Sequence, residues 1–148
     1  MNFYPPKLQE IVDTISMFKD QNDRINVLID YAEKYKELSE SIVSRPYPNE
    51  HKVEYCESEA YVWAKKNIDG TIKLYFAVEN PQGVSAKALA VILDEGLSGE
   101  TAENILKVKT DIVFDIFGQS LSMGKNLGLT GILQHVQKEI KRQLKSTS

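Results

Sequence analysis

The side chain with the clearest chemical reactivity is the one cysteine of this 148-residue chain, Cys56. A single cysteine cannot close an internal disulfide, so we expect a free thiol, which suits a reducing compartment. A cysteine kept for packing would lie in a periodic apolar face, whereas this one is flanked by polar residues, namely Glu54, Glu57, Ser58 and Glu59. The position predicts a reactive thiol on a surface loop, and a small buried hydrophobe is the alternative.

The reactivity of a thiol depends on its thiolate form, which a nearby cation, a hydrogen bond or a helix N-terminus favours. The carboxylates around Cys56 act in the opposite direction, so compensation must come from a residue distant in sequence. The candidates that could supply it are Arg45, His51, Lys87 and Lys125.

Other site chemistries find less support in the sequence. A hydrolase would use His51 or His135 as the base for Cys56, but nothing near the cysteine resembles an oxyanion-hole loop. One cysteine and two scattered histidines lack the paired short spacings of structural zinc, so no metal is predicted. Three glycines near the last helix lack phosphate-binding spacings and are better explained by close packing: Gly124, Gly128 and Gly131.

Composition and charge limit the class of protein. Hydrophobic residues at 42% and charged residues at 26% are ordinary globular values, and the length suits one domain over residues 1–148. A net charge of -3 without a long basic stripe argues against a nucleic-acid coat, and the uncharged stretches are too short for a membrane span. The first residues have neither signal-peptide nor transit-peptide composition, so a cytoplasmic location is expected.

The first half of the chain predicts helices followed by strands. Apolar residues recur at three- and four-residue steps over 8–18 and 25–35, which indicates two amphipathic helices. Serines and prolines over 39–51 predict a surface loop. Alternation over 72–78, a turn at 67–70 and a preceding strand over 61–66 predict an antiparallel hairpin, to which residues 52–55 could add a third strand.

The second half predicts helices. Asn80-Pro81 is a good helix opening, and the apolar pattern that follows stops at Gly96. Thr101 is expected to cap a short helix, another short helix to stop at Gly118, and a final helix to carry residues 129–144. The whole pattern predicts an α+β fold, in which a small antiparallel sheet of about three strands packs against the N-terminal and C-terminal helices. Aromatic residues expected in the sheet core are Tyr61, Trp63, Tyr75 and Phe76.

The basic residues at the end of the last helix are expected to complement its dipole, with a docking patch as the alternative. They are Lys138, Lys141, Arg142 and Lys145.

From Cys56 onward the chain resembles the SufE family of sulfur acceptors, which activate a cysteine desulfurase in iron–sulfur cluster assembly. The resemblance is carried by the order and spacing of short motifs along most of the chain, namely Cys56, Ser58 and Tyr61, then residues 69–70, 87–89, 99–105 and 121–129. It implies a SufE/IscU-like fold.

The resemblance also implies a mechanism. Cys56 would carry a persulfide received from a SufS-like, pyridoxal-phosphate-dependent desulfurase, and would pass the sulfur to an iron–sulfur scaffold complex. Lys125, where the family has arginine, would be an electrostatic helper. The chain would thus be a sulfur-transfer accessory protein rather than a stand-alone enzyme, with no cofactor, nucleic-acid or membrane partner of its own and a weak homodimer as a possible state.

The alternative implied by the resemblance is a noncatalytic module that binds the desulfurase but transfers sulfur poorly. Tyr55 and Glu59 stand where the family has glycine and glutamine. A tyrosine removes backbone freedom from the loop, and a glutamate adds a charge that disfavours the thiolate.

Overall fold

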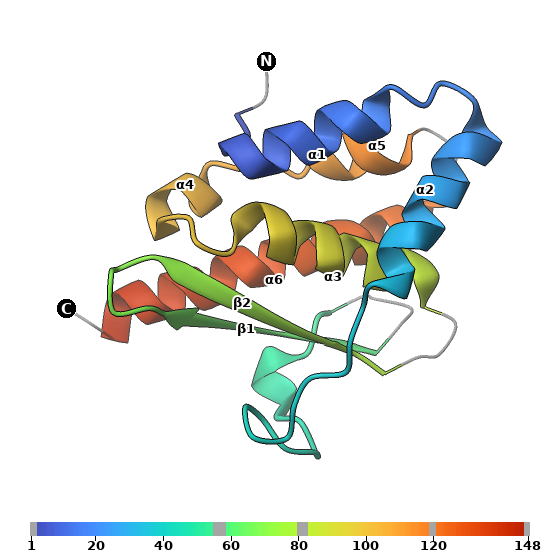
Figure 1. The fold of residues 1–148 in the computed structure, drawn as a ribbon. Helices are drawn as coiled ribbons and strands as arrows, with labels where there is room; N and C mark the ends of the chain where they lie inside the picture. Colours follow the sequence, from blue (N-terminus) through green and yellow to red (C-terminus); the bar gives the residue numbers. More distant parts are fainter. Residues whose placement is uncertain (1–2, 55–58, 80–82, 119–120, 147–148) are drawn as a thin grey trace.

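The computed structural model describes residues 3–54, 59–79, 83–118 and 121–146, in which two helices precede a β-hairpin and further helices follow it (Figure 1). The elements in chain order are α1 (Pro6–Ser16), α2 (Gln21–Glu33), the 3-10 turn η1 (Asn49–His51), β1 (Ala60–Lys66), β2 (Ile72–Val78), α3 (Val84–Leu97), α4 (Ala102–Leu106), α5 (Ile112–Phe117) and α6 (Met123–Ser146). The α+β class predicted from the sequence is confirmed.

The helix boundaries follow local capping chemistry. The Asp20 carboxylate accepts hydrogen bonds from the first backbone N–H groups of α2, and the Thr101 hydroxyl does the same for α4, as predicted. Gly118 ends α5 with a φ of 78°, also as predicted. The expected opening of α3, Asn80-Pro81, lies outside the described residues, and the first helical residue is Val84.

The hairpin has the predicted turn but fewer strands than expected. β1 and β2 pair antiparallel from Ala60↔Val78 to Lys66↔Ile72, and Gly70 takes a φ of 90° in the turn between them. Within the described ranges the sheet has two strands, so the expected third strand over 52–55 is wrong. That segment follows the 3-10 turn η1 and makes a single bridge to β1, between Lys52 and Tyr61.

The main core lies between the hairpin and the helices (Figure 1). In this arrangement β1 packs against α6, β2 packs against α3, and α1 and α2 cover the other side of α3. α3 ends at Leu97, one residue after the glycine at which the sequence predicted its end, and Gly96 is buried in its last turn. A Cβ at this position would meet Leu8 Cδ1 at 2.7 Å, so the glycine allows α1 to approach α3 closely.

The opposite face of the hairpin carries a second, smaller core. Tyr61 and Trp63 point to this side and pack with Tyr47 and Ala77, as expected from strand alternation. Phe76 belongs to the main core instead, while Tyr75 is partly buried beside the second one. The loop from residue 34 to η1 therefore covers a sheet face that would otherwise expose two aromatic rings.

None of the helices in the described part of the chain has the length and apolar character that crossing a membrane requires.

Candidate functional site

The segment that carries Cys56 is bounded by two well-anchored ends. Residues 55–58 lie outside the described residues, so the predicted exposure of Cys56 stays a prediction. The described chain stops at Glu54 and resumes at Glu59, immediately before β1. The described residues nearest to Cys56 in the sequence are therefore those at these two ends.

The N-terminal end is held against both β1 and α6. The Val53 N–H donates to the Ala60 carbonyl at 2.8 Å, and the Val53 side chain is buried. On the other side, a Cβ at Gly131 of α6 would lie only 3.0 Å from the Glu54 carbonyl oxygen. The close packing predicted for Gly131 is confirmed. Because glycine has no side chain, the backbone at Glu54 can lie directly against α6.

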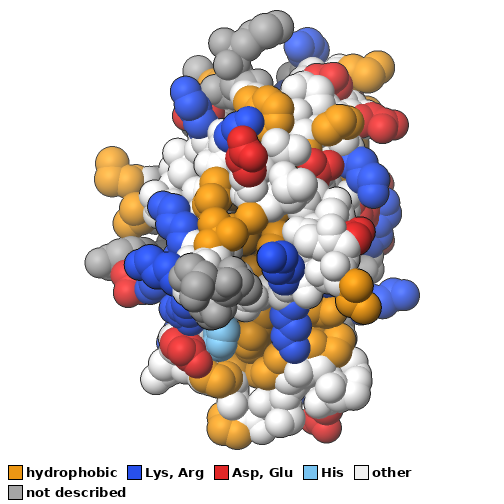
Figure 2. All heavy atoms as spheres, turned by 90° about the vertical axis from the view of Figure 1, so that its left-hand side faces the viewer, with side chains coloured by type: hydrophobic (Ala, Val, Ile, Leu, Met, Phe, Trp, Pro, Cys, Tyr) orange, Lys and Arg blue, Asp and Glu red, His pale blue; other side chains and the backbone are white. Residues whose placement is uncertain are grey.

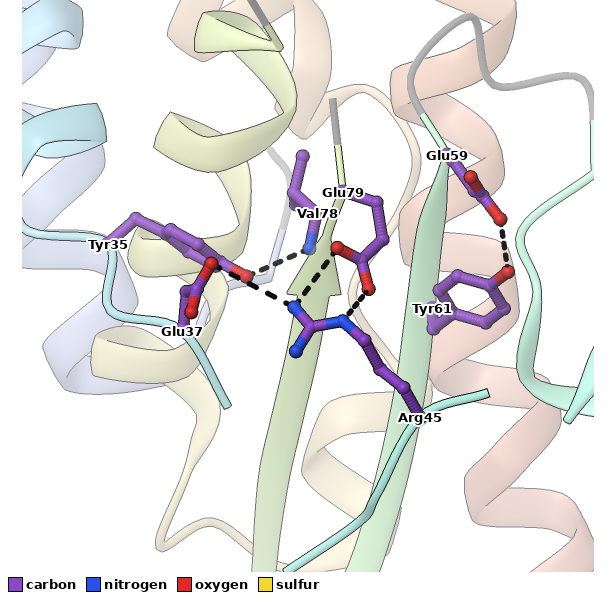
Figure 3. Close-up of polar contacts among 7 residues, drawn as sticks. All are labelled: Tyr35, Glu37, Arg45, Glu59, Tyr61, Val78 and Glu79. Carbon is purple, nitrogen blue, oxygen red and sulfur yellow. Dashed lines mark hydrogen bonds and ion pairs between the residues drawn. The ribbon is translucent and has the colours of Figure 1, made fainter. Parts of the chain in front are cut away.

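The C-terminal end is held by β2 and by a tyrosine (Figure 3). The Glu79 N–H donates to the Glu59 carbonyl at 2.8 Å, and the Tyr61 hydroxyl donates to Glu59 Oε1 at 2.5 Å. This hydrogen bond and burial raise the pKa of Tyr61 to about 12. The sequence analysis treated the Glu59 carboxylate as an added charge near the cysteine. In the structure, the Tyr61 phenol fixes this carboxylate just before β1.

Arg45, one of the candidate cations, is engaged by carboxylates of the hairpin and the covering loop. Its guanidinium donates to both oxygens of Glu79, at 2.8 and 3.1 Å, and Nη2 lies 3.8 Å from Glu37 (Figure 3). A bidentate pair of this kind both neutralises the guanidinium charge and fixes the orientation of its plane. Arg45 therefore fastens the covering loop to the end of β2.

His51, a second candidate, lies in a polar cluster around the buried Glu139 carboxylate. Its Nδ1 contacts the Val62 carbonyl at 3.0 Å and the Glu139 carboxylate, and its ring stacks on Trp63 at 5.1 Å between centroids. Glu139 is only 3% exposed and also pairs with Arg142 Nη1 at 3.0 Å. The cluster ties η1 to β1 and α6, so His51 acts in the described structure as a structural connector.

The remaining candidates lie on other surfaces. Lys87 Nζ lies 5.6 Å from the Tyr35 ring centroid. Lys125 is exposed in the first turn of α6, where its N–H donates to Ser122 Oγ at 3.2 Å. Its side chain lines a groove of about 410 Å³ that includes Val84 and Phe117 but not Glu54. The role that the resemblance implies for Lys125 remains a prediction.

The basic end of α6 has a partly structural role. Arg142 pairs with Glu139 and, at 3.5 Å, with Glu50, so its charge holds η1 in place. Lys138 and Lys141 are exposed. Figure 2 shows Lys and Arg side chains spread over the face that it draws, at its centre and on both sides. The dipole and docking explanations for the exposed lysines both stay predictions.

His135 has an unusual environment. The residue is 6% exposed, and Nε2 has no hydrogen-bond partner among the described residues, while the ring bonds to the backbone of Glu50. Burial, reinforced by the positive charges of Lys138 and Arg142, lowers its pKa to about 4. The imidazole is therefore neutral at pH 7 and presents an unsatisfied nitrogen.

We predict that His135 makes the fold sensitive to mild acid. Because its pKa falls from 6.5 in the unfolded chain to about 4 on folding, the unfolded state binds the proton first as the pH drops. Stability is complete above about pH 6.5 and falls by on the order of 2 kcal/mol as the pH approaches 4. Urea unfolding at pH 7 and pH 4.5 measures the loss of stability in the wild type and in His135→Gln, and the loss should be smaller in the variant. Equal losses in both proteins would contradict the prediction, because the loss would then come from groups other than His135.

A hollow of about 210 Å³ lies beside the N-terminal end of the cysteine segment, and we call it the loop-base hollow. It is lined by Glu54, Leu127, Gly131, Gln134, His135 and Lys138. The sequence analysis placed Lys138 only among the basic residues at the end of the last helix. Helical spacing could have shown that it lies on the same face of α6 as Gly131 and His135.

Comparison with known proteins gives the family. The family model described as "SufE: Fe-S metabolism associated domain" matches residues 9–140. The chain belongs to the SufE family. SufE-like protein 1, chloroplastic/mitochondrial, of Arabidopsis thaliana is 32% identical over 136 residues, which cover 91% of this chain and 35% of that protein. The chain thus spans about a third of the length of this SufE relative.

A solved structure has the same fold. The solution structure of a hypothetical protein from Thermus thermophilus superimposes with a TM-score of 0.74 at 26% identity, covering 97% of this chain and 99% of that one. The family match and the relative confirm the SufE family predicted from the sequence. The description of the family model supports a role in iron–sulfur metabolism.

Proposed function

We propose that this SufE-family protein accepts sulfur from a cysteine desulfurase onto Cys56, stimulates that enzyme, and passes the sulfur to an iron–sulfur scaffold. The observation that carries the proposal is the family match over residues 9–140 in a chain with one cysteine. Cys56 lies inside the matched range, and a covalent sulfur carrier of this class needs a thiol.

The transfer is a thiolate displacement at sulfur. The Cys56 thiolate attacks the terminal sulfur of the desulfurase persulfide, a new S–S bond forms, and the old S–S bond breaks to leave the desulfurase cysteine as a thiolate. Sulfur moves at the same oxidation level, so the step needs no oxidant or reductant. The pyridoxal phosphate that releases sulfur from free cysteine belongs to the desulfurase, and this chain supplies only the acceptor thiol.

The anchoring of the cysteine segment supports this function. Both ends are hydrogen-bonded to the hairpin, and α6 approaches the first end through Gly131. Because both ends are fixed, contact between a partner and the segment would leave the core unchanged. The Tyr61 hydroxyl donates to the Glu59 carboxylate and fixes its position at the start of β1.

The proposal is tested by incubating the protein with a cysteine desulfurase and free cysteine, then weighing the intact chain by mass spectrometry. Addition of one sulfur atom, removed by a reducing agent, is the expected result. Tight binding to the desulfurase without any sulfur addition, seen with several desulfurases, would identify the noncatalytic module instead and overturn the carrier role.

A further inference from the structure

A hollow of about 420 Å³ lies between side chains on the C-terminal half of α6, and we call it the basic hollow. It is lined by Gln134, Gln137, Lys138, Lys141, Arg142 and Lys145. Every charged residue in this set is a cation. The set extends about 16 Å along the helix axis, because each helical residue adds about 1.5 Å.

The acidic residue of α6 points away from this hollow. Glu139 is 3% exposed and contacts His51 and Arg142 in the interior. Glu50 reaches Arg142 at 3.5 Å but does not line the hollow. Arg142 is therefore partly neutralised, whereas Lys138 and Lys141 have no ion-pair partner among the described residues.

The base of the basic hollow is fixed to the rest of the protein. Gln137 Nε2 donates to the Ile105 and Val108 carbonyls, at 3.2 and 2.7 Å, which holds α6 against the end of α4. The Lys138 and Lys141 side chains are exposed above it. A ligand that pairs with these lysines would thus meet a surface whose backbone is already in place.

The helix dipole explains only part of this charge. Its effect is confined to about the last turn of a helix, in which Lys145 is the basic residue. Lys138 and Lys141 lie further from the end of α6. Like charges three or four residues apart on a helix repel each other, and these lysines have that spacing. An anionic ligand would replace the repulsion with attraction.

The lining residues favour one class of anion. They include no aromatic ring on which a base could stack and no apolar side chain that could enter a lipid interface. The net charge of -3 of the chain repels a long polyanion outside the hollow. A short acidic peptide matches the hollow in charge and in length, since about five extended residues span about 16 Å.

We propose that the basic hollow binds an acidic segment of another protein, whose carboxylates pair with Lys138 and Lys141. The surface goes beyond the proposed function and does not rest on it, because no step of the sulfur transfer involves these lysines.

The test is binding of a dye-labelled hexaglutamate peptide with blocked ends to the full-length protein, followed by fluorescence anisotropy. The affinity should fall steeply between about 0.01 and 0.15 M salt, as screening increases. Replacing both lysines, Lys138→Gln with Lys141→Gln, should weaken binding about tenfold at low salt. Replacing both with arginine should retain the affinity, because the charge is kept.

Lys7→Gln with Lys19→Gln is the matched control, since it removes the same charge from two exposed lysines that do not line the basic hollow. Its affinity should stay within about twofold of the wild type. Equal losses in the two glutamine pairs, or no binding of the peptide, would overturn the proposal. Tighter binding of inorganic phosphate, an oligothymidylate or phosphatidylserine vesicles than of the peptide would overturn an acidic protein segment as the ligand. The assay contains no desulfurase, so its outcome is separate from that of the sulfur-loading experiment.

Discussion

Cys56→Ser should reduce sulfur loading at least about 100-fold, because a hydroxyl is a far weaker nucleophile than a thiolate and forms no persulfide. Intact mass after incubation with desulfurase and free cysteine measures the loading. Stimulation of the desulfurase, followed as sulfide or alanine release, should fall to the level of the enzyme alone. Binding to the desulfurase, measured separately, should persist.

The stability of Cys56→Ser distinguishes a surface thiol from a packed one. A reactive thiol at the surface predicts a free energy of unfolding within about 0.5 kcal/mol of the wild type. A loss of more than about 2 kcal/mol would support the alternative of a small buried hydrophobe, because a serine hydroxyl would then be buried without a partner. In that case the loss of loading would no longer show that the thiol itself reacts.

Local signals predict most of the fold. The hairpin turn, the Thr101 cap and the Gly118 helix end are decided by residues within a few positions of one another, and the structure has all three. The error is the third strand, since the described residues after η1 make a single bridge to β1, between Lys52 and Tyr61. The close contact of Gly96 with Leu8 joins residues far apart in the chain, so no local pattern predicts it.

The electrostatics of the site cannot be predicted in the same way. The sequence offers a set of candidate cations for Cys56, but pairings such as Arg45 with Glu79 and His51 with Glu139 join residues 34 and 88 positions apart. These contacts depend on how α6 and the covering loop meet the hairpin, which no local pattern encodes.

Glu139→Ala should lower the free energy of unfolding by about 1–3 kcal/mol, the usual effect of removing a buried acceptor from its hydrogen-bond donors. The carboxylate is 3% exposed and is shared by His51 and Arg142. Its removal leaves the imidazole against Trp63 and the guanidinium at the edge of the core without their common acceptor. Urea unfolding at pH 7 measures the loss, which is a large share of the about 5–15 kcal/mol that holds a typical domain together.

Glu103→Ala is the matched control, because Glu103 also pairs with a basic residue on a helix but is 80% exposed. Its loss should be below about 0.5 kcal/mol, as for other surface pairs. Glu139→Gln should fall between the two, since the amide oxygen can still accept from His51 while the charge facing Arg142 is lost. Equal effects of the two alanine substitutions would contradict a structural role for the buried cluster. A large effect confined to Glu139 would mean that the contact joining η1 to α6 stabilises the frame from which the cysteine segment departs.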